Sequence, residues 1–187
     1  MSKRIVAVGA AVLLSAGCGG EDPAPTWQAP PSPAAPTSAA PARLAKITSA
    51  CDLLPAAKVI DLLGGNGQTK LSGRELPREK RENGNVWRHC GYGRGGNEPF
   101  RLSVATMPDR ADTVDETIDA VAEAAGNGSK RIEGLGSAAV GYTEGEGRSV
   151  MAVAPYQKEL RVVQFTGPAL VPQDKLAEVV RQVIGKI

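Results

Sequence analysis

The residues SVMAVA (149–154), PYQKE (155–159) and LRVVQFT (160–166) decide the fold of this chain. The first and third runs are extended, apolar and of strand length. The five residues between them are polar and begin with a proline, which indicates a turn. Because so short a link cannot carry a parallel crossover, the two runs are predicted to pair as antiparallel strands.

The segments on either side of this pair extend the pattern. Residues 138–142 form another extended run, separated from residue 149 by a turn-rich sequence, so three strands are predicted to form a meander. Residues 172–187 predict the best amphipathic helix of the protein. Its apolar stripe consists of Leu176, Val179, Val180, Val183, Ile184 and Ile187.

Upstream, helical and strand-like periodicities alternate. Residues 112–125 have apolar side chains at helical spacing and end at Gly126, which predicts a second amphipathic helix. Residues 86–94 and 100–107 predict a hairpin around Gly95-Gly96-Asn97, since Phe100, Leu102 and Val104 alternate with polar side chains.

A short helix and a polar stretch precede the hairpin. Pro55 can open a helix that ends at Gly64-Gly65. Residues 66–85 carry a run of charges and are predicted to be a surface loop, with one strand near residues 69–71. The resulting order predicts an antiparallel α+β domain over residues 47–187, with five to six strands and about three helices that cover both sheet faces.

The composition of the chain disfavours several classes of function. The 187 residues are 42% hydrophobic and 22% charged, which is typical of one globular domain. Without Lys3 and Arg4 the chain has 20 basic and 20 acidic side chains, a balance that argues against nucleic-acid binding. One histidine and three cysteines offer little for cofactor, metal or acid–base chemistry, so no catalytic or cofactor-binding residue is predicted.

The N-terminus has the pattern of an export signal. Residues 1–4 are basic, residues 5–14 are apolar and small residues precede Cys18, which predicts a signal peptide over residues 1–17. Ten apolar residues span only about 15 Å as a helix, too little to cross a membrane. The small residues and cysteine resemble the lipobox of bacterial lipoproteins, in which the cysteine is acylated. The alternative is a secreted protein cut near Ala16.

Residues 18–46 are predicted to be a disordered tether that begins at the lipidated Cys18. The segment is rich in proline and alanine and has one large apolar side chain, Trp27. Proline-rich chains extend to about 3.1 Å per residue, so the tether is a semi-rigid spacer. A proline-motif ligand at residues 30–33 is the alternative. The sequence thus predicts a domain anchored to the extracytoplasmic face of the cell membrane.

The remaining cysteines, Cys51 and Cys90, are predicted to form a disulfide, since an even pair in an exported domain favours one. A zinc site with His89 is the alternative, but His89 and Cys90 are neighbours and would point to opposite faces of a strand. His89 is the only histidine, and the sequence shows no nucleophile motif that would partner it.

Three short motifs carry a family resemblance. They are Cys51-Asp52-Leu53-Leu54, Cys90-Gly91-Tyr92 and the sequence GLGSAA at 134–139. Together with the terminal helix, lipobox and tether they resemble the DUF3558-type lipoproteins of actinobacteria. This resemblance implies an envelope protein with a Mog1/PsbP-like α-β-α sandwich, similar to lipoproteins of the LpqN type, and brings no catalytic residues. Two positions depart from the usual family pattern. Pro55 stands where a Thr or Ser helix cap is expected, and Ser137 stands where Asp is common.

Two functions follow as expectations. The first is a non-catalytic accessory or binding lipoprotein that engages an envelope protein or another envelope component. The second is a carrier of a small hydrophobic ligand or lipid, which would need surplus apolar volume between sheet and helices. An envelope hydrolase is the least favoured class.

Overall fold

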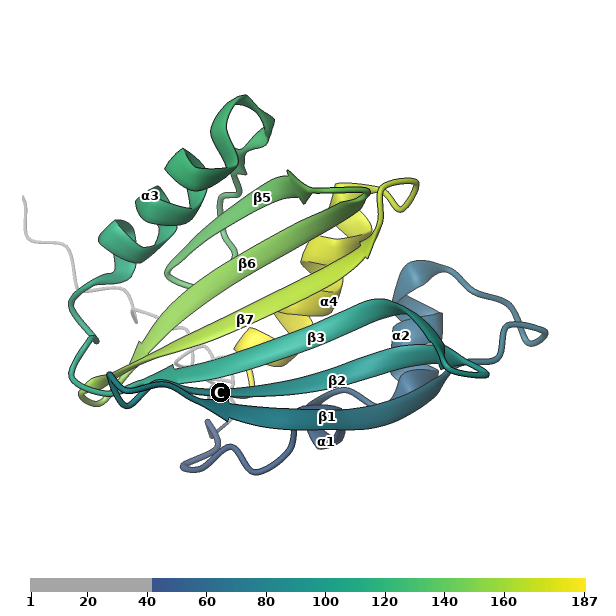
Figure 1. The fold of residues 1–187 in the computed structure, drawn as a ribbon, viewed down its shortest axis with the longest axis horizontal. Helices are drawn as coiled ribbons and strands as arrows, with labels where there is room; N and C mark the ends of the chain where they lie inside the picture. The colour runs from purple at the N-terminus through teal and green to yellow at the C-terminus, as the bar shows by residue number, and fades with distance from the viewer. Residues whose placement is uncertain (1–41) are drawn as a thin grey trace, which may run out of the picture. The chain divides into compact units, whose positions relative to one another are not determined.

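Seven antiparallel strands in the order β1-β2-β3-β7-β6-β5-β4 form the centre of the computed structural model, which describes residues 42–187 (Figure 1). The predicted fold class, an antiparallel α+β domain, is confirmed. The strands are β1 (Ser72–Lys80), β2 (Val86–Arg94), β3 (Asn97–Met107), β4 (Lys130–Arg131), β5 (Ala138–Glu144), β6 (Gly147–Tyr156) and β7 (Glu159–Pro168).

The chain builds this sheet from two meanders. One comprises β1, β2 and β3, and the other runs from β4 to β7. Between them the chain crosses to the far edge of the sheet and returns, so that β7 pairs with β3 in antiparallel register. The predicted hairpin and three-strand meander are both present; β2 has the predicted bounds, and β3, β5, β6 and β7 are each a few residues longer than predicted.

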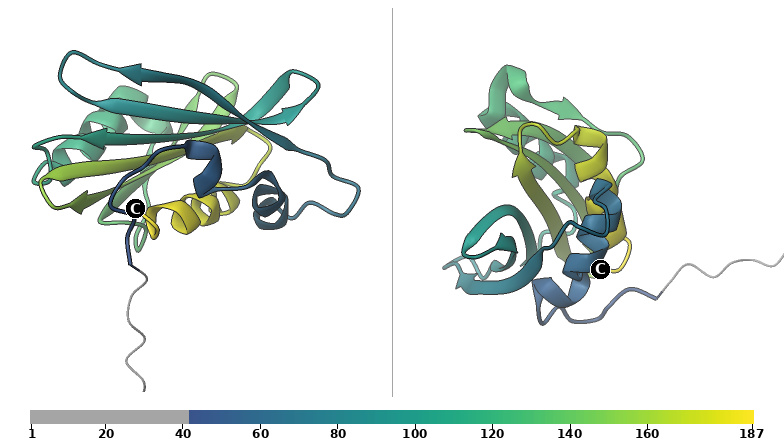
Figure 2. Two further views of the ribbon diagram at one scale, coloured as in Figure 1. Left: turned by 90° about the horizontal axis from the view of Figure 1, so that it is seen from below. Right: turned by 90° about the vertical axis from the view of Figure 1, so that its right-hand side faces the viewer.

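Helices cover the sheet unequally on its two faces (Figure 2). On one face α3 (Val114–Ala125) packs against β5 and β6, followed by a single 3₁₀ turn, η1 (Gly126–Gly128). On the other face lie α1 (Ala50–Leu53), α2 (Ala56–Leu63) and α4 (Gln173–Ile184). α4 contacts β6 and β7, and its predicted stripe is buried.

Each face therefore has its own apolar core. The α4 side contains Leu102, Val163 and Phe165, all fully buried, together with the α4 stripe. The α3 side contains Ile118 of the helix and Val162 of the sheet. Because alternate residues of β7 point to opposite faces, Val162 and Val163 serve different cores.

Residues 66–85, predicted to be a surface loop, contain the edge strand β1 over Ser72–Lys80, and no strand forms at residues 69–71. The expectation was wrong because β1 has only one neighbour and exposes nearly all of its side chains, so no alternation of apolar residues marks it. Backbone pairing with β2 defines it instead. The two-residue strand β4 and the four-residue helix α1 were also not predicted, being too short for a periodic pattern.

The chain enters the domain along the α4 side. Arg161 is 1% exposed and donates hydrogen bonds to the backbone carbonyls of Leu44 and Ala45. It also pairs with Glu159 at 2.7 Å and lies over the ring of Tyr156. Arg43, Leu44 and Ala45, near the end of the expected tether, therefore contact the domain.

Candidate functional site

A polar groove of about 440 Å³ lies on the sheet face that carries α3. Because α3 packs over β5 and β6, β2 and β3 are uncovered on this face (Figure 1). We call it the sheet groove. It is lined by Glu79, Arg81, Trp87, His89, Glu98, Pro99, Arg101, Ser103, Glu144, Gln164 and Thr166.

Strand register places the central side chains of the groove in two rows. In one row His89 of β2 is opposite Ser103 of β3, which is opposite Gln164 of β7. In the next row Arg101 of β3 is opposite Thr166 of β7. Alternation along each strand points these residues to the groove, while their sequence neighbours fill the core behind the sheet.

His89 is held by a cross-strand contact. Its Nδ1 lies 2.8 Å from Ser103 Oγ, and Glu79 Oε1 lies 3.5 Å from its Nε2 without hydrogen-bond geometry. Burial lowers the pKa of His89, because the desolvation of the imidazolium outweighs its attraction to Glu79. The imidazole is therefore mostly neutral at pH 7.

Two buried nitrogens of the groove residues have no hydrogen-bond partner within residues 42–187: Trp87 Nε1 and His89 Nε2. Trp87 is 9% exposed, and its ring lies parallel to that of His89 with centroids 6.2 Å apart. An unpaired buried N–H costs about 1–3 kcal/mol, so such groups are uncommon in folded proteins. Two nitrogens of the groove residues can therefore form hydrogen bonds that no side chain of the described residues provides.

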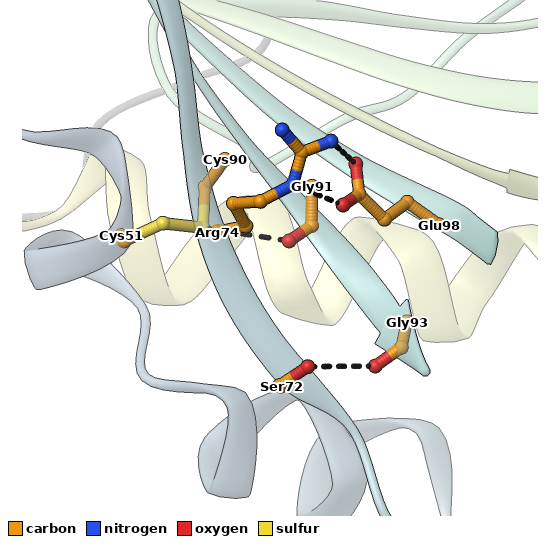
Figure 3. A network of polar contacts seen from close by, with 7 residues as sticks. All are labelled: Cys51, Ser72, Arg74, Cys90, Gly91, Gly93 and Glu98. Atoms are coloured by element: carbon orange, nitrogen blue, oxygen red, sulfur yellow. Dashed lines mark hydrogen bonds and ion pairs between the residues drawn. A yellow bond between two sulfur atoms is a disulfide. The ribbon is translucent and has the colours of Figure 1, made fainter. Parts of the chain in front are cut away.

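Charged side chains of both signs lie in the groove and beside it. Arg74 of β1 donates two hydrogen bonds to Glu98, at 2.6 and 3.0 Å (Figure 3). A Cβ atom at Gly91 would lie 2.3 Å from Glu98 Oε2. Because glycine has no Cβ, the carboxylate of Glu98 can lie directly over the backbone of β2 at this position. Arg81 lies 5.5 Å from the centroid of the Trp87 ring. Glu98 and Arg81 both line the groove, and Arg74 holds Glu98 from outside it.

The sequence placed His89 in a strand but identified no partner for it, and the structure corrects this with Ser103 and Glu79. Alternation over residues 100–107 already puts Ser103 and Arg101 on one face. Which residue stands opposite His89 depends on a register shift in the β2–β3 hairpin, between Tyr92 and Arg94. A bulge of this kind has no clear sequence signal.

Cys51 and Cys90 form a disulfide, drawn beside β1 in Figure 3. It lies on the opposite side of the sheet from the groove, because Cys90 follows His89 in β2 and points to the other face. The alternative zinc site fails because both sulfurs are in this bond and His89 points to the other face. Glu75 lies near the two sulfurs, but its carboxylate accepts hydrogen bonds from Ser49 Oγ and from the backbone N–H groups of Ala50 and Cys51. It caps α1.

Fold and groove together define a disulfide-linked α+β domain with one helix-covered sheet face and one partly open polar face. The chain belongs to the family described as "Protein of unknown function (DUF3558)", which matches residues 13–156. The resemblance seen in the sequence motifs is thereby confirmed at the level of this family. No curated protein and no solved structure matches the chain.

The predicted signal peptide, the lipidated Cys18 and most of the tether lie outside the described residues. Within residues 42–187, no helix is long and apolar enough to cross a membrane.

Proposed function

We propose that this protein is a non-catalytic, lipid-anchored lipoprotein of the cell envelope whose domain binds a partner or ligand through the sheet groove. Cys18 carries the lipid, residues 19–42 separate the domain from the membrane, and the domain works on the extracytoplasmic side. The disulfide supports this placement, because such bonds persist in oxidising compartments. We also propose the Mog1/PsbP-like kinship of the fold and an actinobacterial source.

The observation that carries the binding role is the indole of Trp87. Its N–H is buried in the groove wall without an acceptor, at a place where His89 Nε2 is also unpaired. A ligand that supplies an acceptor to the indole N–H and a hydrogen-bond partner to His89 Nε2 would remove the cost of leaving them unpaired. Structural polar clusters normally satisfy themselves, so this pattern favours a binding surface.

Hydrolysis is less well supported. Ser103 contacts His89 and His89 lies near Glu79, which is the spatial order of the nucleophile, base and acid in a catalytic triad. Acyl transfer needs N–H donors aimed at the developing oxyanion. Ser103 lies inside β3, which is paired on both sides, so the backbone N–H groups around it are used in the sheet. The trio therefore lacks the donors that an acyl-transfer site takes from its backbone.

The carrier alternative needs an apolar cavity between sheet and helices. The side chains of both cores are tightly buried, with Leu102, Phe165, Ile118 and Val162 all at 0% exposure. A larger hollow of about 780 Å³ lies at β4 and the start of α4, but seven of its ten lining residues are charged. The hollow is open to solvent, so it would not enclose a lipid tail as a carrier site must.

The anchor is tested with a Cys18→Ser variant of the full chain. We expect the wild-type protein to partition into membrane and detergent fractions and the variant to leave them, because the variant has no thiol to acylate. Ser15→Ala is the matched control, since it keeps a small residue before the cysteine. Mass spectrometry of the mature N-terminus should show the acyl groups. An unchanged distribution of Cys18→Ser would reject the anchor.

A further inference from the structure

We infer that the sheet groove binds a neutral saccharide, a ligand class that the family description does not provide. The inference rests on the proposed binding function and specifies its ligand. It follows from three properties of the groove: its mixture of hydrogen-bond donors and acceptors, its balance of charge, and the spacing of its rows.

Donors and acceptors are interleaved in the groove. The guanidinium of Arg101 donates, the carboxylate of Glu144 accepts, and Gln164 does both. A sugar hydroxyl also donates and accepts, so a polyhydroxylated ring matches such a surface better than a ligand with acceptors alone. Gln164 makes only a 3.4 Å contact with Thr166 Oγ1, so most of its amide is available.

The charges of the groove cancel. Glu79, Glu98 and Glu144 are opposed by Arg81 and Arg101 in the lining and by Arg74, which holds Glu98. A site for phosphate or carboxylate would have an excess of cations. A lipid tail would need exposed apolar surface, but Trp87, the large aromatic residue of the lining, is only 9% exposed. The remaining class is neutral and polar.

The geometry of the rows suits a ring. In the first row His89 and Ser103 contact each other at 2.8 Å, so the open polar group of that row is the amide of Gln164. Rows on one face are two residues apart along a strand, about 6.6 Å, which is comparable to the length of a sugar ring. The second row, with Arg101 and Thr166, lies two residues further along the strands and could contact the next ring of a disaccharide.

The test uses the indole N–H signal of Trp87 in NMR spectra of the ¹⁵N-labelled full chain. A Trp87→Phe variant assigns this signal against that of Trp27. The probes are glucose, galactose, arabinose, N-acetylglucosamine and maltose, each at about 20 mM, which detects dissociation constants in the mM range. Sodium phosphate and laurate are added separately. We expect at least one sugar to shift the Trp87 signal in a saturable manner.

Two matched pairs of variants locate the effect. Arg101→Gln and Glu144→Gln change the groove. Arg94→Gln, at the end of β2, and Glu146→Gln, on the β5–β6 turn, change exposed residues outside its lining. We expect the groove variants to weaken sugar binding at least tenfold and the controls to leave it unchanged. Equal binding by all four would place the sugar elsewhere and overturn the inference.

The other outcomes separate this inference from the proposed function. A shift by phosphate or laurate but by no sugar would overturn the saccharide and keep the groove as a binding site. No shift by any probe would also overturn the saccharide, while the anchor is judged independently by the fractionation of Cys18→Ser.

Discussion

At the scale of single residues, two of the family motifs prove to be halves of one structural unit. Cys51 is bonded to Cys90, and the hydroxyl of Tyr92 donates a 2.7 Å hydrogen bond to the backbone carbonyl of Leu54. Gly91, between Cys90 and Tyr92, makes room for Glu98 on the groove side. The motif Cys90-Gly91-Tyr92 thus binds α1 on one face of β2 and shapes the groove on the other.

The disulfide gives the first prediction at this scale. Thiol counting on the unreduced, denatured chain should detect neither Cys51 nor Cys90. Because the bond closes a separation of 39 residues, a Cys51→Ser/Cys90→Ser variant should lose about 4 kcal/mol in the free energy of unfolding. Two reactive thiols in the wild-type domain, or stoichiometric zinc, would contradict the pairing.

His89 gives a prediction about pH. Its folded-state pKa is lowered, mainly by burial, so the unfolded chain binds more protons than the folded one once the pH falls below the ordinary histidine value of about 6.5. The stability that His89 contributes is present above that value and is lost as the pH falls through the lowered pKa. Urea midpoints measured between about pH 7.5 and about pH 5 should therefore fall with acidity.

His89→Gln is the comparison for this prediction. The variant cannot titrate in that window, so its midpoint should change less with pH than that of the wild type, whatever its stability at pH 7.5. Parallel curves for the two proteins would show that the burial of His89 does not affect its protonation.

At the scale of elements, the loop between β4 and β5 shows what glycine provides. Gly134 and Gly136 both have positive φ, at 66° and 63°, and Leu135 between them is 1% exposed. The changes of chain direction at Gly134 and Gly136 place Leu135 in the core of the α4 side. The backbone N–H of Ser137 then donates a hydrogen bond to the carbonyl oxygen of Val153. This arrangement explains the GLGSAA motif.

The two glycines should respond differently to alanine. A Cβ at Gly136 would lie 2.7 Å from the backbone oxygen of Val153, whereas one at Gly134 would meet no atom within 4 Å. Gly134→Ala should cost about 1–2 kcal/mol from backbone strain alone, and Gly136→Ala should cost more because the strand must also move. Chemical denaturation of both variants measures this, and equal losses would refute the steric part of the argument.

Edge strand β1 belongs to the same scale. Nearly all of its side chains are exposed, and Pro77 lies at its register shift between Leu76 and Glu79. Proline and charge on an edge strand discourage pairing with other chains. The charge run that the sequence suggested was a loop is therefore a strand with a protected edge.

At the scale of the whole molecule, the two ends of the described chain meet on the α4 side. The backbone N–H of Leu44 donates to the carbonyl of Lys186, and Lys186 Nζ donates to the carbonyl of Leu53. Arg161 of β7 holds the same entering segment. In the proposed anchored protein, these contacts would connect the tether firmly to the sheet.

Arg161 carries the prediction at this scale. Arg161→Ala leaves Glu159 and the carbonyls of Leu44 and Ala45 without their donor, so the free energy of unfolding should fall by about 3 kcal/mol. Limited proteolysis should also cut faster at residues 43–46. The control is Arg181→Ala, whose exposed pair with Glu178 contributes less than about 1 kcal/mol. Equal proteolysis of both variants would mean that Arg161 does not hold the segment.

The sequence by itself determined the antiparallel class, the hairpin, the meander and the two amphipathic helices, because alternation and helical spacing are local patterns that burial imposes on each element. It also identified the two cysteines that pair. Only the tertiary structure decided that the charge run is the edge strand β1, since backbone pairing leaves no mark on exposed side chains. The groove also depends on the tertiary structure. A register shift in the hairpin places Ser103 opposite His89, and the position of α3 over β5 and β6 leaves that face of β2 and β3 open. Both depend on contacts between residues far apart in the chain, which local patterns do not encode.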